Sequence, residues 1–376
     1  MIKSDIETGD EFVTIKKRIG ILTFHRTINY GGVLQAYALK KVIERLGCEC
    51  NIIDYKNQYI EKINEVKLIK FNGVKEFLNG MLSFKSKKNK LEKFIEFRQV
   101  FLKPTGCINE YISDEYDSFI VGSDQVWNYL LSDFDRTYFL DFVKGSRKKN
   151  AYSASFGISN IPEEIKAEYS NLLSTFNRIS IRENSGLEII KDLIDAEVSV
   201  VLDPTLLISQ TEWKQFFKIS KKIYKEYIIL YLMIPEPNIL RFTEELSRLT
   251  GCEIIYITSK VKKTINARYA REVSPTEWVE LIMNAKYVVT NSFHGVAFSI
   301  NFNKEFFMGL LPEPSEVNSR LENVLRLFNL EKRKINNYSK PIDFHSINYE
   351  TVNNILRKER DESIRFLNSI IEETYE

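Results

Sequence analysis

Short apolar runs alternate with amphipathic stretches along most of the chain, a pattern typical of parallel sheets covered by helices. The first run, IGILTF at 19–24, predicts a strand that is followed by a polar loop. Apolar side chains then recur at helical spacing over 33–46, and Gly47 is placed to end that helix. A strand at 48–54 completes a βαβ unit. Four further strands are predicted at 118–121, 150–154, 178–181 and 198–202.

A second series of alternating elements follows the segment LDPTLL. Asp203 and Pro204 mark a boundary, because the residue before a proline is disfavoured in a helix. From Tyr349 onward the pattern predicts a long amphipathic helix, which we expect to pack back on the first lobe. The strands of this second series are predicted at 227–232, 253–257, 287–290 and 305–308. The predicted parts of this α/β chain are an N-terminal lobe at 17–203, a C-terminal lobe at 204–348 and a C-terminal helix at 349–376.

The composition narrows the class of protein. A length of 376 residues suits two domains rather than one. The formal net charge of +2 argues against a dedicated nucleic-acid partner. No run approaches about 18 apolar residues, and the polar N-terminus lacks the apolar core of a secretory signal, so we expect a cytoplasmic protein. Four cysteines without a CxxC pair predict neither disulfides nor a metal site.

One segment departs from this balanced charge. Residues 62–103 hold 11 Lys or Arg against 4 Glu, with phenylalanines interleaved, and two amphipathic helices inserted into the first lobe fit this pattern. One hypothesis is a solvated helical face; the other is a surface that touches anionic lipid headgroups at the inner face of the membrane. The residues that would form the second are Lys85, Lys87, Lys88 and Lys90, flanked by Phe84 and Phe94.

The most distinctive motif is YVVTNSFHGVAFSI at 287–300, an apolar strand that ends in a polar turn and a short helix. Ligands of open α/β sheets bind at the carboxyl ends of strands, and a helix N-terminus favours an anion. His294, beside Asn291, Ser292 and Gly295, is therefore a candidate phosphate ligand or proton donor. Arg320 lies in the first turn of a later predicted helix, where a cation opposes the helix dipole, so we expect it to bind an anion.

Polar loops also follow the predicted strands of the first lobe. The loop HRTINYGG matches neither GxGxxG nor a P-loop, but Asn29, Tyr30 and Gln35 are suited to hydrogen-bond sugar hydroxyls, and Gly31 permits close approach.

The later segments FIVGSDQVWN, SASFG and ISIREN repeat this strand-to-loop pattern. In the first of them, a tryptophan face beside a carboxylate suits a sugar ring. The residues they contribute are Ser123, Asp124, Trp127, Ser155, Arg182 and Glu183.

Taken in order, seven segments resemble the polysaccharide pyruvyl transferase family: IGILTFHRTINYGGVLQAYAL, FIVGSDQVWN, SASFG, ISIREN, VLDPTLL, VVTNSFHGVAFSI and NSRLENVLRLF. They extend from about residue 19 to 330. The resemblance implies two Rossmann-like lobes facing a cleft, as in GT-B glycosyltransferases. It also implies phosphoenolpyruvate as donor, a sugar diol as acceptor and a cyclic pyruvate ketal as product, in capsule, exopolysaccharide or cell-wall glycan synthesis. The histidine and arginine of the family's donor lobe carry over to His294 and Arg320, and no cofactor is implied.

Phosphoenolpyruvate carries a phosphate and a carboxylate, so its site needs cationic and N–H donors. The reaction also needs an acid for the methylene carbon and a base for the hydroxyls, and we assign His294 as the acid and Asp124 and Glu183 as candidate bases. The predicted donor site comprises Asn291, Ser292, His294, Gly295, Arg320, Lys304 and Arg182. The predicted acceptor site comprises His25, Asn29, Tyr30, Gly31, Gln35, Ser123, Asp124, Trp127 and Ser155.

Two alternatives stay open at the level of sequence. One is a glycosyltransferase of the same two-lobed fold that uses a nucleotide sugar; the other is a protein that binds glycan without catalysis. The expected partners are phosphoenolpyruvate and a sugar acceptor, free or lipid-linked.

Overall fold

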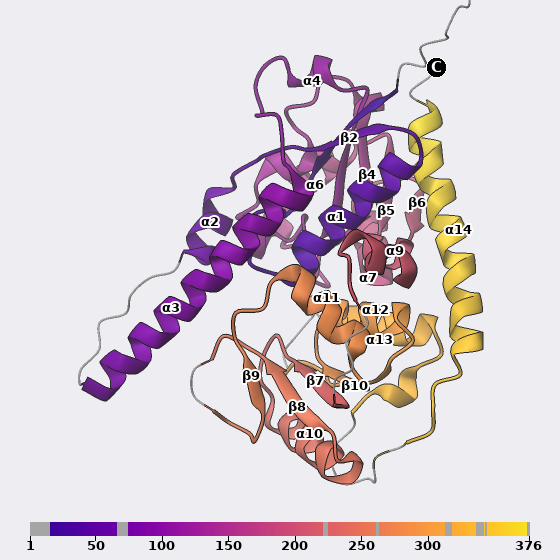
Figure 1. Cartoon of the computed structure of the whole chain (residues 1–376). Coiled ribbons are helices and arrows are strands. Elements are labelled where there is room, and N and C mark those ends of the chain that lie inside the picture. The colour runs from indigo at the N-terminus through magenta and orange to yellow at the C-terminus, as the bar shows by residue number, and fades with distance from the viewer. Residues whose placement is uncertain are drawn as a thin grey trace, which may run out of the picture.

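In the computed structural model, two α/β lobes lie one above the other, each built on a parallel sheet (Figure 1). The structure describes residues 16–65, 74–220, 225–260, 263–312, 318–335, 342 and 344–373. Every strand pair in both sheets is parallel, and helices lie between most successive strands. This confirms the predicted fold class of two Rossmann-like lobes.

The N-terminal lobe holds a six-stranded sheet of order β2-β1-β3-β4-β5-β6. Its strands are β1 (Arg18–Leu22), β2 (Glu49–Ile52), β3 (Ser118–Asp124), β4 (Lys149–Ala154), β5 (Arg178–Ile181) and β6 (Val198–Val200). Its helices are α1 (Tyr30–Arg45), α2 (Gln58–Asn64), α3 (Val74–Phe97), α4 (Ile112–Glu115), α5 (Tyr129–Ser132), α6 (Glu163–Leu173) and α7 (Asn184–Leu193). A π-helical turn, Arg98–Leu102, follows α3.

The C-terminal lobe holds a five-stranded sheet of order β11-β10-β7-β8-β9. Its strands are β7 (Tyr227–Tyr231), β8 (Glu253–Ile257), β9 (Arg268–Ala270), β10 (Tyr287–Thr290) and β11 (Glu305–Met308). The helices from the lobe junction onward are α8 (Pro204–Leu207), α9 (Gln210–Phe216), α10 (Pro237–Thr250), α11 (Pro275–Asn284), α12 (Phe293–Asn301), α13 (Asn318–Leu327) and α14 (Tyr349–Glu373).

Each sheet reverses its winding direction at one point, and crevices for ligands form at such switch points. In the first sheet the reversal lies between β1 and β3, and Asp124 ends β3 at that point. In the second sheet it lies between β7 and β10, where Tyr231 and Thr290 end the two strands. In both lobes, predicted site residues therefore lie at strand ends where this kind of fold binds ligands.

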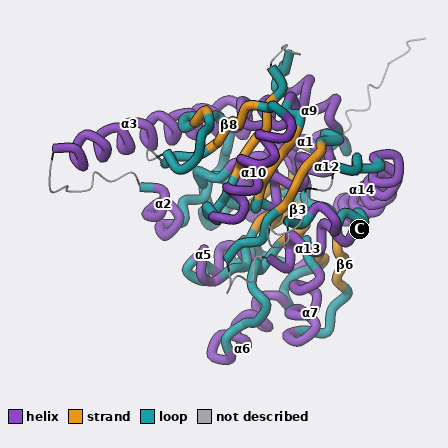
Figure 2. The backbone as a smooth tube through the Cα atoms, turned by 90° about the horizontal axis from the view of Figure 1, so that it is seen from below, coloured by secondary structure: helices purple, strands orange, loops and turns teal. Residues whose placement is uncertain are grey.

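Two long helices tie the lobes together, and they lie on opposite sides of the molecule (Figures 1 and 2). Helix α3 leaves the N-terminal lobe and contacts the other lobe through Lys93, whose ammonium lies 2.9 Å from the Glu277 carboxylate. On the other side, α14 contacts the N-terminal lobe, because Ser363 Oγ accepts a hydrogen bond from Leu202 N at 3.0 Å. Arg360 on α14 also donates to the Leu206 carbonyl at 2.5 Å.

The apolar pattern predicted most elements well. Four strands, β5, β8, β10 and β11, have the predicted bounds, and α14 begins at the predicted Tyr349. The three-residue strand β9 was not predicted, because Arg-Tyr-Ala has no apolar run to mark it. Across the described residues, no helix combines the length and apolar character needed to cross a membrane.

The basic segment 62–103 forms the end of α2, helix α3 and the π-helical turn, with residues 66–73 outside the described residues. Phe94 is buried, with its ring 5.1 Å from that of Tyr30, so it cannot flank a lipid-facing surface as predicted. Lys90 is partly buried, while Lys85 and Lys88 are exposed. Lys87 is exposed as well, so only Lys90 of the four lysines is drawn in from the surface, and contact with lipid headgroups stays a prediction.

Candidate active site

Asp203 lies at the centre of a buried polar cluster where β6 meets the N-terminus of α8. Its Oδ2 accepts hydrogen bonds from Arg182 Nη1 at 2.9 Å and from Ser123 Oγ at 3.0 Å. Its Oδ1 accepts from the backbone N–H and the hydroxyl of Thr205 at 3.0 and 2.6 Å. Burial alone would raise the pKa of Asp203, but the charges of His294 and Arg182 hold it well below its usual range. The carboxylate is therefore a fixed anion.

Arg182 follows β5 and is surrounded by three carboxylates. Besides its bond to Asp203, its Nη2 lies 3.8 Å from Asp124 and its Nε 3.7 Å from Glu183. Its guanidinium carbon lies 4.5 Å from the ring centre of Phe293, a cation–π contact across the lobes. Burial alone would lower the pKa of Arg182, but these carboxylates outweigh it and raise the pKa. Within the described part of the chain, Nε and Nη2 have no hydrogen-bond partner.

Arg320, on the first turn of α13, is the second buried guanidinium of the site. Burial, followed by the charge of nearby Arg182, lowers the pKa of Arg320 to about 10. Its Nε has no hydrogen-bond partner among the described residues. A buried N–H without a partner is costly, so this side chain is suited to accept an anion that enters the site.

Both guanidinium groups line a cavity of about 250 Å³ between the lobes, which we call the arginine cavity. It is smaller than the roughly 300–1,000 Å³ typical of sites for drug-sized ligands, which suits a small donor. Its other walls are the β6 end at 200–203, Phe293 at the start of α12, and Glu359 on α14. Burial raises the pKa of Glu359, helped by the nearby Glu362 carboxylate. The lining residues are Arg182, Glu183, Asn184, Val200, Val201, Leu202, Asp203, Leu206, Phe293, Arg320, Asn323, Val324, Leu327 and Glu359.

His294 lies behind Asp203 and does not line this cavity. Its Nε2 is 3.5 Å from Asp203 Oδ2, within ion-pair distance but without a hydrogen bond. The other edge of the imidazole packs against Gly31 of the N-terminal lobe, where an added Cβ would lie 1.9 Å from Nδ1. At the start of α12, Ser292 Oγ accepts from Gly295 N at 3.4 Å, so the side-chain cap uses one of the N–H groups predicted to bind the donor.

The two predicted bases differ in their surroundings. Glu183 is 2% exposed; its Oε1 accepts from Ser155 Oγ at 2.7 Å, and its Oε2, 3.7 Å from Arg182 Nε, has no hydrogen-bond partner among the described residues. Asp124 is more accessible, with 14% of its side chain exposed. Its backbone φ of 67° is in the left-handed region, a conformation that is rare outside glycine and that clusters at functional sites.

Two predicted site residues are in the wrong place. Lys304 precedes β11 at the amino end of the second sheet, whereas Ser292 follows the parallel strand β10 at its carboxyl end. Four residues of strand separate these edges by roughly 13 Å, so Lys304 does not belong to the donor site. Trp127 is fully buried, donates from Nε1 to the Tyr138 carbonyl at 3.1 Å and stacks on Phe139, so it offers no face to a sugar.

Other predicted ligand contacts are engaged within the protein. The ring nitrogens of His25 lie 3.0 Å from the Thr23 carbonyl and from Asp54 Oδ1. The buried Gln35 amide donates to Thr23 Oγ1 at 2.8 Å. Neither His25 nor Gln35 is therefore placed to contact an acceptor sugar. Asn291 holds the loop after β7, because its amide accepts from Met233 N and donates to the Ile234 carbonyl, both at 2.7 Å.

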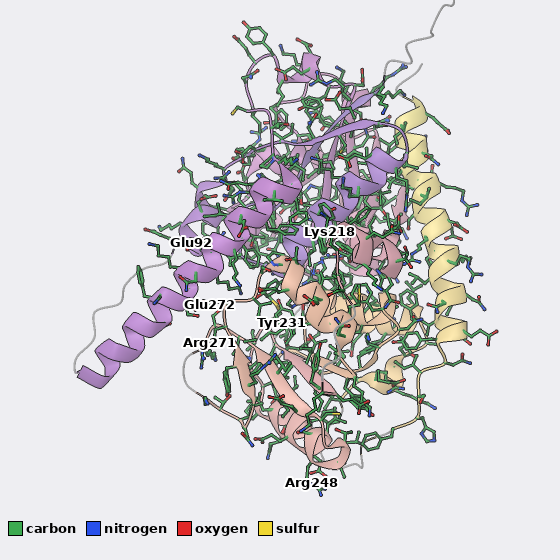
Figure 3. The ribbon with its side chains drawn as sticks, in the orientation of Figure 1. Glu92, Lys218, Tyr231, Arg248, Arg271 and Glu272 are labelled. Atoms are coloured by element: carbon green, nitrogen blue, oxygen red, sulfur yellow. The ribbon has the colours of Figure 1, made fainter. Side chains whose placement is uncertain are left out.

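The start of α1 also serves packing. Asn29 caps the helix by accepting from Gly31 N at 2.9 Å. The Tyr30 hydroxyl donates to the Val273 carbonyl of the other lobe at 3.0 Å, and the ring lies 5.7 Å from that of Tyr231. Tyr231 marks the upper end of the lower sheet in Figure 3, where it faces the upper lobe. The fully buried Ser123 and Ser155 act through Asp203 and Glu183 rather than on a ligand.

Sequence reasoning missed Asp203 as a site residue and treated it as a boundary. The available signal was an aspartate that follows an apolar strand and precedes a proline, the arrangement of a helix cap at a strand end. Among the described residues, no group of three or more His, Cys, Asp or Glu side chains is arranged to hold a metal ion.

Comparisons with known proteins bear on this site. The family model described as polysaccharide pyruvyl transferase matches residues 29–309. No curated protein matches the sequence. Among solved structures, UDP-GlcNAc 2-epimerase from Methanocaldococcus jannaschii is 14% identical with a TM-score of 0.42, and 92% of this chain and 99% of that chain are covered. The glycosyltransferase SnogD from Streptomyces nogalater is 9% identical with a TM-score of 0.42, over 96% and 100% of the two chains.

Proposed function

The chain belongs to the polysaccharide pyruvyl transferase family, and from this premise we propose that it transfers the pyruvyl group of phosphoenolpyruvate to a sugar diol. The product is a cyclic pyruvate ketal, and phosphate is released. One observation carries the proposal: Arg182 and Arg320 line one small cavity with buried N–H groups that have no hydrogen-bond partner in the described chain.

The chemistry of the donor fits these two side chains. Phosphoenolpyruvate presents a phosphate and a carboxylate close together, and a guanidinium binds either group through two parallel hydrogen bonds. Asp203 neutralises and orients Arg182, which leaves Arg320 as the cation that the donor itself pairs with. Binding an anion there would offset the burial that now lowers the pKa of Arg320.

The reaction requires balanced proton transfers. A proton is added to the methylene carbon as one sugar hydroxyl adds to the central carbon and loses its own proton. Phosphate then leaves with a proton, and the second hydroxyl adds and loses its proton as the ketal closes. Glu183 lines the arginine cavity with a free Oε2, so we assign it as the base for the first hydroxyl. The more exposed Asp124 at the β1–β3 switch point is assigned to the second.

His294 is assigned to positioning Asp203, and through it Arg182, rather than to direct binding of phosphate or direct protonation of the donor. Its imidazole faces Asp203, and Asp203 lines the cavity, so His294 acts on the site by holding that carboxylate in place at the cavity wall. This assignment replaces the predicted direct contact between His294 and the donor.

Phosphate release tests the proposed function. The protein is incubated with phosphoenolpyruvate and a panel of lipid-linked and nitrophenyl sugars, and free phosphate is measured. We expect release that depends on both substrates. A parallel thermal-shift series separates the alternatives: stabilisation by nucleotide sugars, with none by phosphoenolpyruvate, would favour the glycosyltransferase. Glycan binding without phosphate release from any pair would favour the non-catalytic protein.

A further inference from the structure

A second cavity, of about 390 Å³, lies at the carboxyl ends of β7 and β8 beneath helix α3. Three of its lining side chains are lysines, and none is acidic, so we call it the lysine cavity. Lys87 and Lys90 reach it from α3, and Lys260 reaches it from the loop after β8. The full lining is Ile28, Asn29, Tyr30, Ser83, Lys87, Lys90, Tyr231, Leu232, Met233, Pro235, Ile257, Thr258, Ser259 and Lys260.

Lys90 is the most constrained of these cations. Its ammonium lies 4.7 Å from the ring centre of Tyr30 and 5.5 Å from that of Phe94. Burial lowers its pKa to about 8. No ion pair joins Lys87, Lys90 or Lys260 to a carboxylate in the described part of the chain, so the cavity carries an excess of positive charge.

The position of α3 over the cavity is fixed by its other contacts. Asn89 Nδ2 donates to the Glu272 carboxylate at 2.9 Å, and Lys93 pairs with Glu277. Figure 3 shows Glu272 beside α3, below the junction of the lobes. Glu272 and Glu277 thus contact the neighbouring positions Asn89 and Lys93 of the same helix, and neither forms an ion pair with Lys87 or Lys90.

The lysine cavity also adjoins the reacting groups. Tyr30 lines it, and the next residue, Gly31, packs against His294. On the other wall, Tyr231 hydrogen-bonds through its side chain to Ser292, the residue that caps the helix of His294. A ligand in this cavity is thus one residue away from the catalytic cluster in each lobe.

We propose that the lysine cavity binds a phosphate or diphosphate group on the acceptor sugar, with Lys87, Lys90 and Lys260 as its ligands. This inference rests on the proposed function for the identity of the sugar as acceptor. Ammonium groups bind phosphate as point charges, and three of them around one cavity suit a group with more than one negative charge. The lysine cavity binds the phosphate group of the acceptor, and the arginine cavity binds the phosphoenolpyruvate donor.

The test uses pyrophosphate as the probe and two charge-matched double variants of the full chain. Lys87→Gln with Lys90→Gln removes two cavity ligands; Lys85→Gln with Lys88→Gln removes the same charge from exposed positions of the same helix. By calorimetry, we expect the first pair to weaken pyrophosphate binding about tenfold or more and the second pair to leave it nearly unchanged. Equal weakening by both pairs, or no binding by the wild type, would overturn the proposal.

A competition step separates this proposal from the proposed function. Saturating phosphoenolpyruvate should leave pyrophosphate binding intact, because the two anions occupy different cavities. Displacement would assign pyrophosphate to the arginine cavity and contradict the lysine site, whatever the activity of the protein. A protein that binds pyrophosphate through Lys87 and Lys90 yet never releases phosphate from phosphoenolpyruvate would keep this site and refute the proposed function.

Two acceptor arms then identify the source of the phosphate. A nucleoside diphosphate sugar and a sugar diphosphate with a short isoprenoid chain are titrated in parallel. Each ligand that binds the wild type should bind the Lys87/Lys90 double variant about tenfold more weakly. The ligand that binds the wild type more tightly identifies the group that carries the acceptor phosphate. If either ligand binds the wild type and the Lys87/Lys90 pair equally well, the lysines do not hold the acceptor phosphate.

Discussion

Arg320 tests the donor site at the scale of one residue. A lysine keeps the charge but cannot form two parallel hydrogen bonds, so Arg320→Lys should raise the KM for phosphoenolpyruvate about tenfold or more and leave the KM for the acceptor nearly unchanged. Arg326→Lys on the exposed face of the same helix is the matched control. If the substitution changed only the KM for the acceptor, Arg320 would belong to the acceptor site and the donor assignment would be wrong.

His294→Ala tests the role of the imidazole that holds Asp203. His294→Ala should lower kcat by about 10²-fold or more, the usual scale for one acid or electrostatic group. Gly31→Ala should have a related effect, because its Cβ would overlap the imidazole, and it should also lower the melting temperature. The melting temperature in the double variant is diagnostic: in the His294→Ala background, Gly31→Ala should cost much less stability. Equal costs in both backgrounds would contradict the packing described here.

Asp203 predicts the pH dependence of stability. Its pKa is depressed in the folded protein, so its contribution to stability is present above the unfolded pKa of about 3.9 and is lost as pH falls below that value. The urea midpoint of the wild type should therefore drop between about pH 5 and pH 3, and the drop should be smaller in Asp203→Asn. The exposed Asp361→Asn serves as control. Identical drops in all three proteins would contradict the claim that Asp203 is a buried anion in the folded protein.

The sequence predicted the positions of several side chains at the carboxyl ends of strands, while their roles stay predictions. Arg182, Glu183 and Asp124 meet at one cluster for that reason. Prediction failed for Trp127, because a tryptophan next to a polar turn looks the same whether its ring faces a ligand or the core. Burial depends on the packing of distant segments, which local sequence does not contain.

At the scale of elements, the helix that braces the lobes is open to test. Arg360 on α14 donates to the Leu206 carbonyl and, at 2.8 Å, to Asn301 Oδ1, while Ser363 of the same helix bonds Leu202 of the N-terminal lobe. Arg360→Gln should lower the free energy of unfolding by about 1–3 kcal/mol, because buried acceptors lose their donors. Arg357→Gln, exposed one turn earlier, should change it by less than about 0.5 kcal/mol. Equal effects of the two changes in urea denaturation would show that α14 does not hold the lobes.

The elements themselves were predictable because their apolar periods are strong, and the capping residues agree with them. Ser274 and Glu277 form a capping box at the start of α11, for example. What the periodicity does not give is the direction in which an inserted helix leaves its lobe. The basic pattern of α3 predicted a charged face, but the contacts of Asn89 and Lys93 with the other lobe direct Lys90 into a cavity.

At the scale of the whole molecule, the site depends on how the two lobes meet. Gly31 and His294 lie on different lobes, and Arg182 contacts Phe293 across the same junction. Such contacts between segments far apart in sequence are set by the packing of the two sheets and their bracing helices. The sequence motifs predicted Arg182 in one lobe and Arg320 in the other as donor ligands, and the structure shows that both side chains line one cavity.

The central claim is the transfer of a pyruvyl group, and isotopic labelling tests it most directly. Phosphoenolpyruvate labelled with ¹³C at its central carbon is incubated with the protein and a sugar acceptor, and the sugar product is followed by NMR. The account predicts that the label appears as a quaternary ketal carbon bonded to two sugar oxygens, with one phosphate released for each ketal, and that Arg320→Lys slows both at low donor concentration. Label that stays in phosphoenolpyruvate while a nucleotide sugar donates its sugar to the same acceptor would contradict it.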